Sequence, residues 1–218
     1  MELFSAFIDF ILHIDVHLDY IVAYAGKFSY FILAAIVFAE TGLVITPFLP
    51  GDSLLFAVGT FAARGAFDLT AIMVVLFVAA VAGDAANYAI GLYFGEKMVR
   101  AKKIRLVQRK HLERTHNFFE KHGAKTIILA RFVPIVRTFA PFVAGMGKMT
   151  YRKFALYNIT GAFLWIFLFV PLGFFFGNQP VVKRNFSLVI LAIIIISVMP
   201  IIVELFLQWR AKLREKRS

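Results

Sequence analysis

Long apolar runs divide the chain, and their lengths predict which of them cross a membrane. A helix needs roughly 20 mostly apolar residues to span about 30 Å of hydrocarbon. Three runs meet this requirement, at residues 69–94, 154–177 and 186–207. Residues 28–46 also meet it, although they include Glu40. The pattern therefore predicts an all-α integral membrane protein with several transmembrane helices.

The first 25 residues follow a different pattern, in which apolar and polar positions are mixed. Apolar side chains recur there at helical spacing, at Phe7, Phe10, Ile11, Ile14 and Leu18. Acids and histidines lie between them, which predicts an amphipathic helix at the membrane interface for residues 1–25. The chain begins without the basic stretch of a cleavable signal peptide, so we expect the whole sequence to be mature. Its length permits one compact domain, so we expect residues 1–218 to form a single membrane domain.

Residues 47–65 are apolar but too interrupted to cross a membrane. The segment opens with TPFLPGD, which contains Pro50 and Gly51, and its uninterrupted apolar run covers only residues 53–63. As a helix this run covers roughly 17 Å, about half of the membrane. We therefore predict a first re-entrant helical hairpin here.

Residues 124–147 form a second interrupted segment, which contains Pro134, Pro141 and Gly145. Pro134 disfavours a continuous helix and separates the apolar pieces 124–132 and 138–146. Two half-length helices joined at a proline predict a second re-entrant hairpin. Such broken backbone is tolerated at membrane depth only where protein buries it or water reaches it.

The charge distribution predicts the orientation of the chain. Hydrophobic residues make up 61% of the sequence and the mean hydropathy is +0.79, yet the net charge is +11. Residues 97–125 hold ten lysines and arginines against two acids, and most of these lie in a predicted helical segment, 97–123. The tail 208–218 holds five lysines and arginines against one acid. Basic segments beside apolar runs are typical of the cytoplasmic side, so both are expected there.

A basic nucleic-acid surface is the competing interpretation of this charge. It is disfavoured because the segments that flank the basic stretches are apolar all round, so we expect no nucleic-acid partner. Re-entry of residues 124–147 also keeps Lys148, Arg152 and Lys153 on the same side as residues 97–123. The first hairpin must then enter from the opposite face, as in inverted-repeat transporters. No residue-level repeat is visible, so this symmetry rests on topology alone.

Four charges lie in or beside the interrupted segments: Glu40, Asp52, Arg131 and Arg137. An unpaired charge at the bilayer centre costs roughly 2.5–3.5 kcal/mol on insertion scales, so these side chains must be paired or solvated. Two acids and two arginines suit mutual pairing, and static salt bridges are one interpretation. The other is transport, because guanidinium binds phosphate bidentately and a poorly solvated acid takes up a proton more readily.

Other polar residues carry weaker signals. Asp84 and Asn87 lie within the span 69–94, where a secondary polar site and a contact between helices are equally compatible with the sequence. Trp165 is expected to pack in mid-span. The chain has no cysteine, and its histidines lie outside the predicted spans, so neither a metal site nor a cofactor is expected. Nucleophile-elbow and zinc-protease motifs are absent, which argues against an enzyme.

Two long motifs identify a family resemblance. Glu40-Thr-Gly followed by Thr46-Pro-Phe-Leu-Pro-Gly-Asp-Ser-Leu-Leu-Phe56 resembles the first signature of the DedA family, whose members share the VTT domain with eukaryotic lipid scramblases. Ala130-Arg-Phe-Val-Pro-Ile-Val-Arg-Thr-Phe-Ala-Pro-Phe-Val-Ala-Gly-Met146 resembles the second. The N-terminal FIDFILHIDVHL and the later GDAANYAIG extend the resemblance over nearly the whole chain.

The resemblance implies a bacterial inner-membrane flippase or scramblase that moves undecaprenyl phosphate or a phospholipid. It also implies a link to proton-motive force and envelope homeostasis. The family's essential acids match Glu40 and Asp52, and its essential arginines match Arg131 and Arg137. The expected partners are lipids with phosphate headgroups and protons, and a homo-oligomer is an open alternative to a monomer. The alternative function is a proton-coupled antiporter or exporter of small cations.

Overall fold

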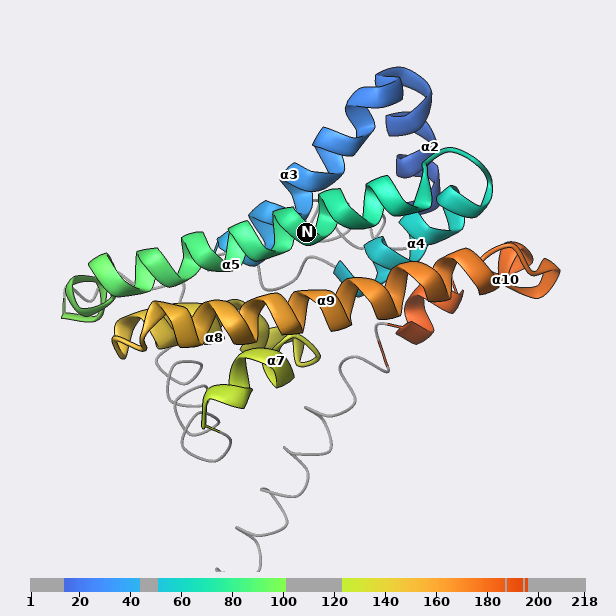
Figure 1. Ribbon diagram of the computed structural model, residues 1–218. Helices are drawn as coiled ribbons and strands as arrows, with labels where there is room; N and C mark the ends of the chain where they lie inside the picture. The colour runs from blue at the N-terminus through green and yellow to red at the C-terminus, as the bar shows by residue number, and fades with distance from the viewer. Residues whose placement is uncertain (1–13, 44–50, 101–122, 187, 194, 196–218) are drawn as a thin grey trace, which may run out of the picture.

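The computed structural model describes residues 14–43, 51–100, 123–186, 188–193 and 195. Within these residues every regular element is a helix, which confirms the all-α prediction (Figure 1). Three segments are long and apolar enough to cross a membrane: Val16–Gly42, Leu69–Gly95 and Tyr151–Phe176. The predicted basic segment 97–123 and the tail 208–218 lie largely or wholly outside the described residues.

Two long helices form the frame of the molecule, α5 (Leu69–Arg100) and α9 (Tyr151–Phe176). They confirm the spans predicted at 69–94 and 154–177, and they run in opposite directions side by side (Figure 1). The short helix α10 (Pro180–Arg184) follows α9. Most of the span predicted at 186–207 lies outside the described residues, although residues 186, 188–193 and 195 are helical.

The N-terminal candidate span Val16–Gly42 is not one straight helix, because the chain changes direction between α2 and α3 (Figure 1). Helix α2 (Ile14–Ala25) leads through the 3₁₀ turn η1 (Gly26–Phe28) into α3 (Ser29–Gly42). Gly26 has a φ of +51°, a left-handed conformation that glycine adopts readily. Ile14 and Leu18, two of the apolar positions predicted for an amphipathic helix, are buried. Residues 1–13 lie outside the described residues.

Two short helices lie against the frame, α4 (Gly51–Ala63) and α8 (Pro134–Met146). Each has 13 residues and is therefore about 20 Å long, too short to cross a bilayer. Residues 51–62 and 138–145 are all buried, so protein encloses both helices. Proline starts α8 rather than only interrupting the segment, because an N1 proline loses no helical hydrogen bond.

A break in the chain precedes α8, as the sequence predicts. The 3₁₀ turn η2 (Gly123–Lys125) and the five-residue helix α7 (Thr126–Ala130) lead into residues 131–133, where α8 begins after an extended Val133. Figure 1 shows the chain reversing direction between α7 and α8. Pro141, the second proline predicted in this segment, lies inside α8.

Helices α4 and α9 approach so closely that glycine is required at their contact. A Cβ atom added to Gly59 of α4 would overlap the carbonyl oxygen of Val170, and one added to Gly173 of α9 would overlap that of Phe56. In both helices the glycine follows the contacted carbonyl by three residues. Small residues allow helix backbones to pack at close range in membranes.

Helices α5 and α8 make the same kind of contact. A Cβ atom on Gly91 of α5 would overlap the carbonyl oxygen of Phe142, and one on Gly145 of α8 would overlap that of Tyr88. The spacing of three residues between carbonyl and glycine is the same as in the α4–α9 pair. The structure therefore contains a local repeat that the sequence did not reveal: each short helix is fitted to a long one by an equivalent double glycine contact.

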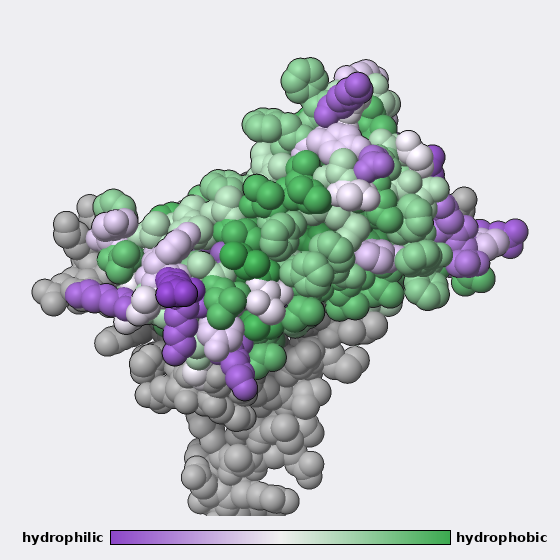
Figure 2. All heavy atoms as spheres, viewed as in Figure 1, coloured by the Kyte–Doolittle hydropathy of each residue, from purple (hydrophilic) through white to green (hydrophobic). Residues whose placement is uncertain are grey.

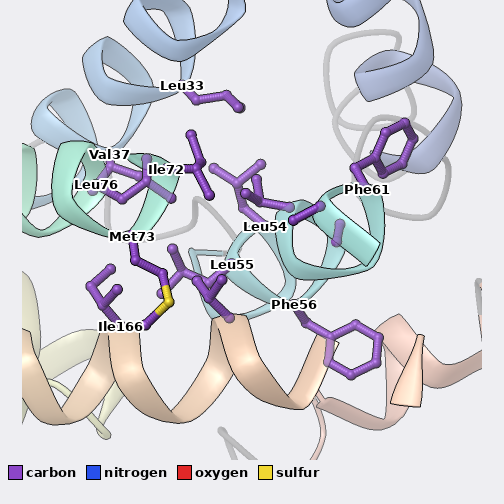
Figure 3. Close-up of a cluster of buried hydrophobic side chains, with 14 of the residues drawn as sticks. Leu33, Val37, Leu54, Leu55, Phe56, Phe61, Ile72, Met73, Leu76 and Ile166 are labelled. Carbon is purple, nitrogen blue, oxygen red and sulfur yellow. The ribbon is translucent and has the colours of Figure 1, made fainter. Parts of the chain in front are cut away.

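Apolar side chains lie both inside the molecule and on its outer surface. Leu55 of α4, Met73 of α5 and Ile166 of α9 belong to one buried cluster (Figure 3). The outer face of α9 exposes Phe163 and Phe167, and Figure 2 shows apolar surface across the middle of the molecule. Apolar side chains that face outward in mid-helix are expected where lipid, rather than water, surrounds the protein.

Candidate functional site

The amino-terminal ends of the two short helices meet near the centre of the molecule. Helix α4 ends where α5 begins and α8 ends where α9 begins, so the antiparallel frame points the two short helices in opposite directions (Figure 1). Asp52 is the second residue of α4 and Arg137 the fourth of α8. Arg137 Nη1 donates a hydrogen bond of 3.2 Å to Asp52 Oδ1. Helix amino termini carry partial positive charge, so their convergence favours an anion.

Arg137 also pairs with Glu40, which lies in the last turn of α3. Its Nη2 donates to Glu40 Oε1, and the backbone N–H of Gly51 donates to the same oxygen at 3.0 Å. A Cβ atom at Gly51 would press against both the Glu40 carboxylate and the Arg137 guanidinium. Gly51 therefore allows α3, α4 and α8 to close around one arginine.

Arg131 has different partners. Its Nη2 donates to Asp84 Oδ2 of α5 at 2.6 Å and to Asn158 Oδ1 of α9 at 2.7 Å. Asn158 Nδ2 in turn donates to the carbonyl of Val81 at 3.0 Å. The pairing expected for both arginines with Glu40 and Asp52 thus occurs for Arg137, whereas Arg131 pairs with a third acid and joins the two long helices.

Asn87, which the sequence grouped with Asp84, makes a contact between helices instead. It is fully buried in α5, and its Nδ2 donates to the carbonyls of Thr41 at 3.0 Å and Thr138 at 2.8 Å. These bonds connect the end of α3 to the start of α8. Asp84 and Asn87 therefore lie near the same centre but have different roles: Asp84 pairs with Arg131, and Asn87 connects α3 to α8.

Sequence reasoning missed the contribution of Trp165, which was expected only to pack. Its indole Nε1–H donates to Asp52 Oδ1 at 2.7 Å. The Cζ of Arg137 lies 4.7 Å from its ring centroid and that of Arg131 lies 5.7 Å away, both within the range of a cation–π contact. One feature of the sequence could have indicated this role, because Trp165 is the one tryptophan within a predicted span. Asn158, also missed, is an amide within the same apolar run.

A small cavity separates the two groups of ion pairs. It has a volume of about 10 Å³, room for roughly one water, and is lined by Thr41, Asp84, Arg131, Arg137 and Trp165. Among the described residues, three buried polar atoms of this region have no hydrogen-bond partner: Glu40 Oε2, Asn87 Oδ1 and Arg131 Nε. Buried polar atoms are ordinarily satisfied, so the centre has capacity for a further polar group.

Within the part of the chain that the structure describes, the site contains three acids, Glu40, Asp52 and Asp84, against two arginines. With every group ionised these five side chains carry a net charge of −1, so a single proton would neutralise them. Among the described residues no group of three or more His, Cys, Asp or Glu could hold a metal ion.

Of the predicted motif residues, Pro50 lies outside the described residues, Pro134 begins α8, and Gly145 lies at the α5–α8 contact.

Comparison with known proteins identifies the family of this chain. Residues 49–175 match the VTT domain, a range that includes both short helices, α5, all of α9 except its last residue, and both arginines. The chain belongs to the DedA family. Within it, Protein DedA of Escherichia coli K12 is 55% identical over 216 residues, which cover 98% of this chain and 99% of the relative.

More distant DedA-family relatives are named as membrane proteins. Uncharacterized membrane protein ML0287 of Mycobacterium leprae is 38% identical, covering 84% of this chain and 82% of its own length. Inner membrane protein YqjA of Escherichia coli K12 is 31% identical over 187 residues, covering 84% and 85%. No solved structure matches the chain. The resemblance seen in the sequence is thus confirmed, and the chain is a DedA-family membrane protein.

Proposed function

We propose that this DedA-family protein is a flippase or scramblase of the bacterial inner membrane. Its cargo is a lipid with a phosphate headgroup, either undecaprenyl phosphate or a phospholipid. The observation that carries the proposal is the Arg137 guanidinium, only 9% exposed and held by two carboxylates where the amino termini of α4 and α8 converge. Guanidinium and helix amino termini both favour phosphate.

Transport begins when a phosphate oxygen replaces a carboxylate on Arg137. The headgroup then takes the N–H donors that Glu40 and Asp52 accept in the empty site. The hydrocarbon tail stays in the bilayer, alongside the apolar outer surface. When the headgroup leaves, the two carboxylates pair with Arg137 again, so the buried charge has a partner at both ends of the cycle.

The proposed membrane topology has α4 re-entering from the outer face and the α7–α8 hairpin from the cytoplasm. Its support is the length of α4 and α8, their enclosure by protein, and their opposite directions from a common centre. Broken helices whose amino termini meet at the midplane form the binding sites of inverted-repeat transporters. In this topology the basic segment 97–123 and the tail 208–218 face the cytoplasm.

Proton coupling forms part of the proposal. Three carboxyl groups share two guanidiniums, so the empty site is neutral only when it holds one proton. A neutral site is less costly to keep away from water than a charged one. Arrival of a phosphate adds negative charge, which favours uptake of a further proton and gives the proton gradient a means of driving release.

Purified protein in liposomes tests the proposal. We expect it to move fluorescent undecaprenyl phosphate, fluorescent phosphatidylglycerol, or both, and Arg137→Ala to slow this movement by at least tenfold. Arg64→Ala is the matched control, since Arg64 lies at the end of α4 and stacks on Phe61, away from the site. If Arg137→Ala and wild type move both lipids equally fast, the proposed function is wrong.

The alternative, a proton-coupled antiporter of small cations, is favoured by one observation, the net −1 charge of the site. It predicts proton flux that depends on a cation gradient and persists when no labelled phosphate lipid is present.

The proposed transporter carries out no covalent chemistry, so mass spectrometry of the lipid recovered after transport should find it unchanged. Recovery of dephosphorylated lipid would instead indicate an enzyme.

A further inference from the structure

Trp165 contacts members of both ion-paired groups. It lies in α9 and is only 1% exposed. Its N–H binds Asp52, its ring lies beside the guanidiniums of Arg137 and Arg131, and it lines the cavity between the two groups. Arg137 and Asp52 belong to the proposed transport site, whereas Arg131 belongs to the contact between α5 and α9.

The ring stabilises Arg137 in a way that an incoming phosphate need not disturb. A carboxylate occupies the guanidinium N–H donors, so phosphate has to displace it. An aromatic face attracts the cation from above its plane and leaves those donors free. The ring can therefore remain in contact with Arg137 while its hydrogen-bond partners change, which keeps the guanidinium in place during the exchange.

The indole N–H has a second effect, on Asp52. Oδ1 of Asp52 accepts from both Trp165 Nε1 at 2.7 Å and Arg137 Nη1 at 3.2 Å. When Arg137 turns its donors toward a headgroup, the indole N–H still binds this oxygen. Each donor that a buried carboxylate loses is costly. Trp165 reduces that cost and keeps the carboxylate within reach of Arg137.

We propose that Trp165 is a positioning residue of the transport site, which holds Arg137 and Asp52 in the geometry that a phosphate headgroup binds. The inference rests on the proposed function and adds the side chain that sets affinity for the headgroup. Because Trp165 holds the receptor groups rather than closing a path, its loss should weaken binding more than it slows the maximal rate.

Liposome transport by two substitutions separates the two contacts. Trp165→Phe keeps an aromatic face and removes the N–H, and Trp165→Leu removes both. We expect the half-saturating lipid concentration to rise on the order of tenfold in Trp165→Leu, and by less in Trp165→Phe, with the maximal rate retained. Phe154→Leu is the matched control: Phe154 is buried in the same helix and stacks on Tyr88, so its loss tests packing alone.

Intrinsic fluorescence gives a second, direct readout. The chain has two tryptophans, so Trp209→Phe leaves Trp165 as the single tryptophan, whose emission is recorded under excitation that tyrosine does not absorb. We expect its emission to shift saturably on addition of a short prenyl phosphate or a short-chain phosphatidylglycerol, and not with the matching prenyl alcohol. The ligand that shifts it at lower concentration identifies the source of the phosphate.

The outcomes separate this inference from the proposed function. If folded Trp165→Phe and Trp165→Leu both have the wild-type half-saturating concentration, the positioning role is wrong, while loss of transport in Arg137→Ala still supports the proposed function. If wild type itself shows no saturable movement of either lipid, both are wrong. If Trp165→Leu fails to fold, Trp165→Phe and the fluorescence titration decide.

Discussion

Arg131 and Arg137 lie six residues apart and have different surroundings. Arg131 binds Asp84 of α5 and Asn158 of α9, both on the long helices of the frame. Arg137 binds Glu40 and Asp52, which lie where α3 ends and α4 begins. The first arginine therefore fixes the frame, and the second lies at the junction where we propose that lipid binds.

The first prediction concerns this framework role. Arg131→Ala should lower the free energy of unfolding by roughly 3–5 kcal/mol, because it leaves Asp84 charged, buried and without its guanidinium. Thermal unfolding in detergent or lipid nanodiscs measures the effect. The double variant Arg131→Ala/Asp84→Asn should recover part of the stability, because it no longer has the uncompensated charge of Asp84. Equal stability of the single and double variants would contradict this role.

The second prediction concerns charge geometry at the junction. Arg137→Lys keeps the positive charge but cannot bind Glu40 and Asp52 through separate nitrogens of one planar group while stacking on Trp165. We expect lipid transport between about tenfold and a hundredfold slower than wild type, yet faster than in Arg137→Ala. The liposome assay measures this order, and a lysine variant as fast as wild type would show that charge alone suffices.

At the residue scale, the sequence identified Glu40, Asp52, Arg131 and Arg137 because charges are rare in apolar runs. It could not assign partners, since Asp84 and Arg131 are 47 residues apart and Asp52 and Trp165 are 113 apart. The sequence also cannot distinguish a tryptophan whose indole N–H binds an acceptor from one that only packs, because the acceptor comes from a distant segment. Pairing at such separations depends on the fold.

At the scale of elements, each short helix is fitted to one long helix through two glycines. The α4–α9 contact uses Gly59 and Gly173, and the α5–α8 contact uses Gly91 and Gly145. Because α4 and α8 start at the proposed transport site, these contacts determine where Asp52 and Arg137 lie along the frame.

The third prediction tests these glycine contacts. Gly59→Ala and Gly145→Ala should each lower the free energy of unfolding by about 1–3 kcal/mol, because the added methyl overlaps a backbone carbonyl of the partner helix. Gly147→Ala is the control, since Gly147 is exposed and its added Cβ would come no closer than 3.2 Å to a carbonyl. Thermal unfolding compares all three, and equal loss in the control would show a general intolerance of alanine in α8 and its C-terminal end.

Helix positions were the most predictable feature at this scale. The spans predicted at 69–94 and 154–177 correspond to α5 and α9, because an uninterrupted apolar run has few other structures available in a bilayer. The segment 124–147 is also broken as predicted, before α8 begins at Pro134, whereas the break predicted at 47–50 lies outside the described residues. The repeat of glycine contacts could not be recognised in the sequence. Each contact repeats only a glycine three residues after the residue whose carbonyl is contacted, and those residues differ: Phe56, Tyr88, Phe142 and Val170.

At the scale of the whole molecule, buried ion pairs connect the two helix pairs. Arg137 of α8 binds Asp52 of α4, and Arg131, which packs against α9, binds Asp84 of α5. Movement of the α4–α9 pair against the α5–α8 pair would have to exchange these bonds. In the proposed mechanism, Arg137 therefore both recognises the headgroup and helps to hold the two helix pairs together.

The fourth prediction tests the orientation of the molecule. The chain has no cysteine, so each introduced cysteine is a unique label site. In intact cells, Arg64→Cys at the α4–α5 turn should react with a membrane-impermeant maleimide from outside. Lys110→Cys and Ser218→Cys should react only after the membrane is opened. Labelling of Lys110→Cys from outside would invert the proposed topology.

The sequence by itself determined the class of protein, two helices long and apolar enough to span a membrane, and the four charges at its centre. These follow from the cost of placing polar groups in hydrocarbon, which acts on each segment separately. The tertiary structure decided which charges pair. It also placed Asp84, Asn158 and Trp165 at the centre. With Asp84 included, three acids lie beside two arginines among the described residues. Ion pairs and ring contacts join atoms from distant segments, so they exist only once the helices have packed.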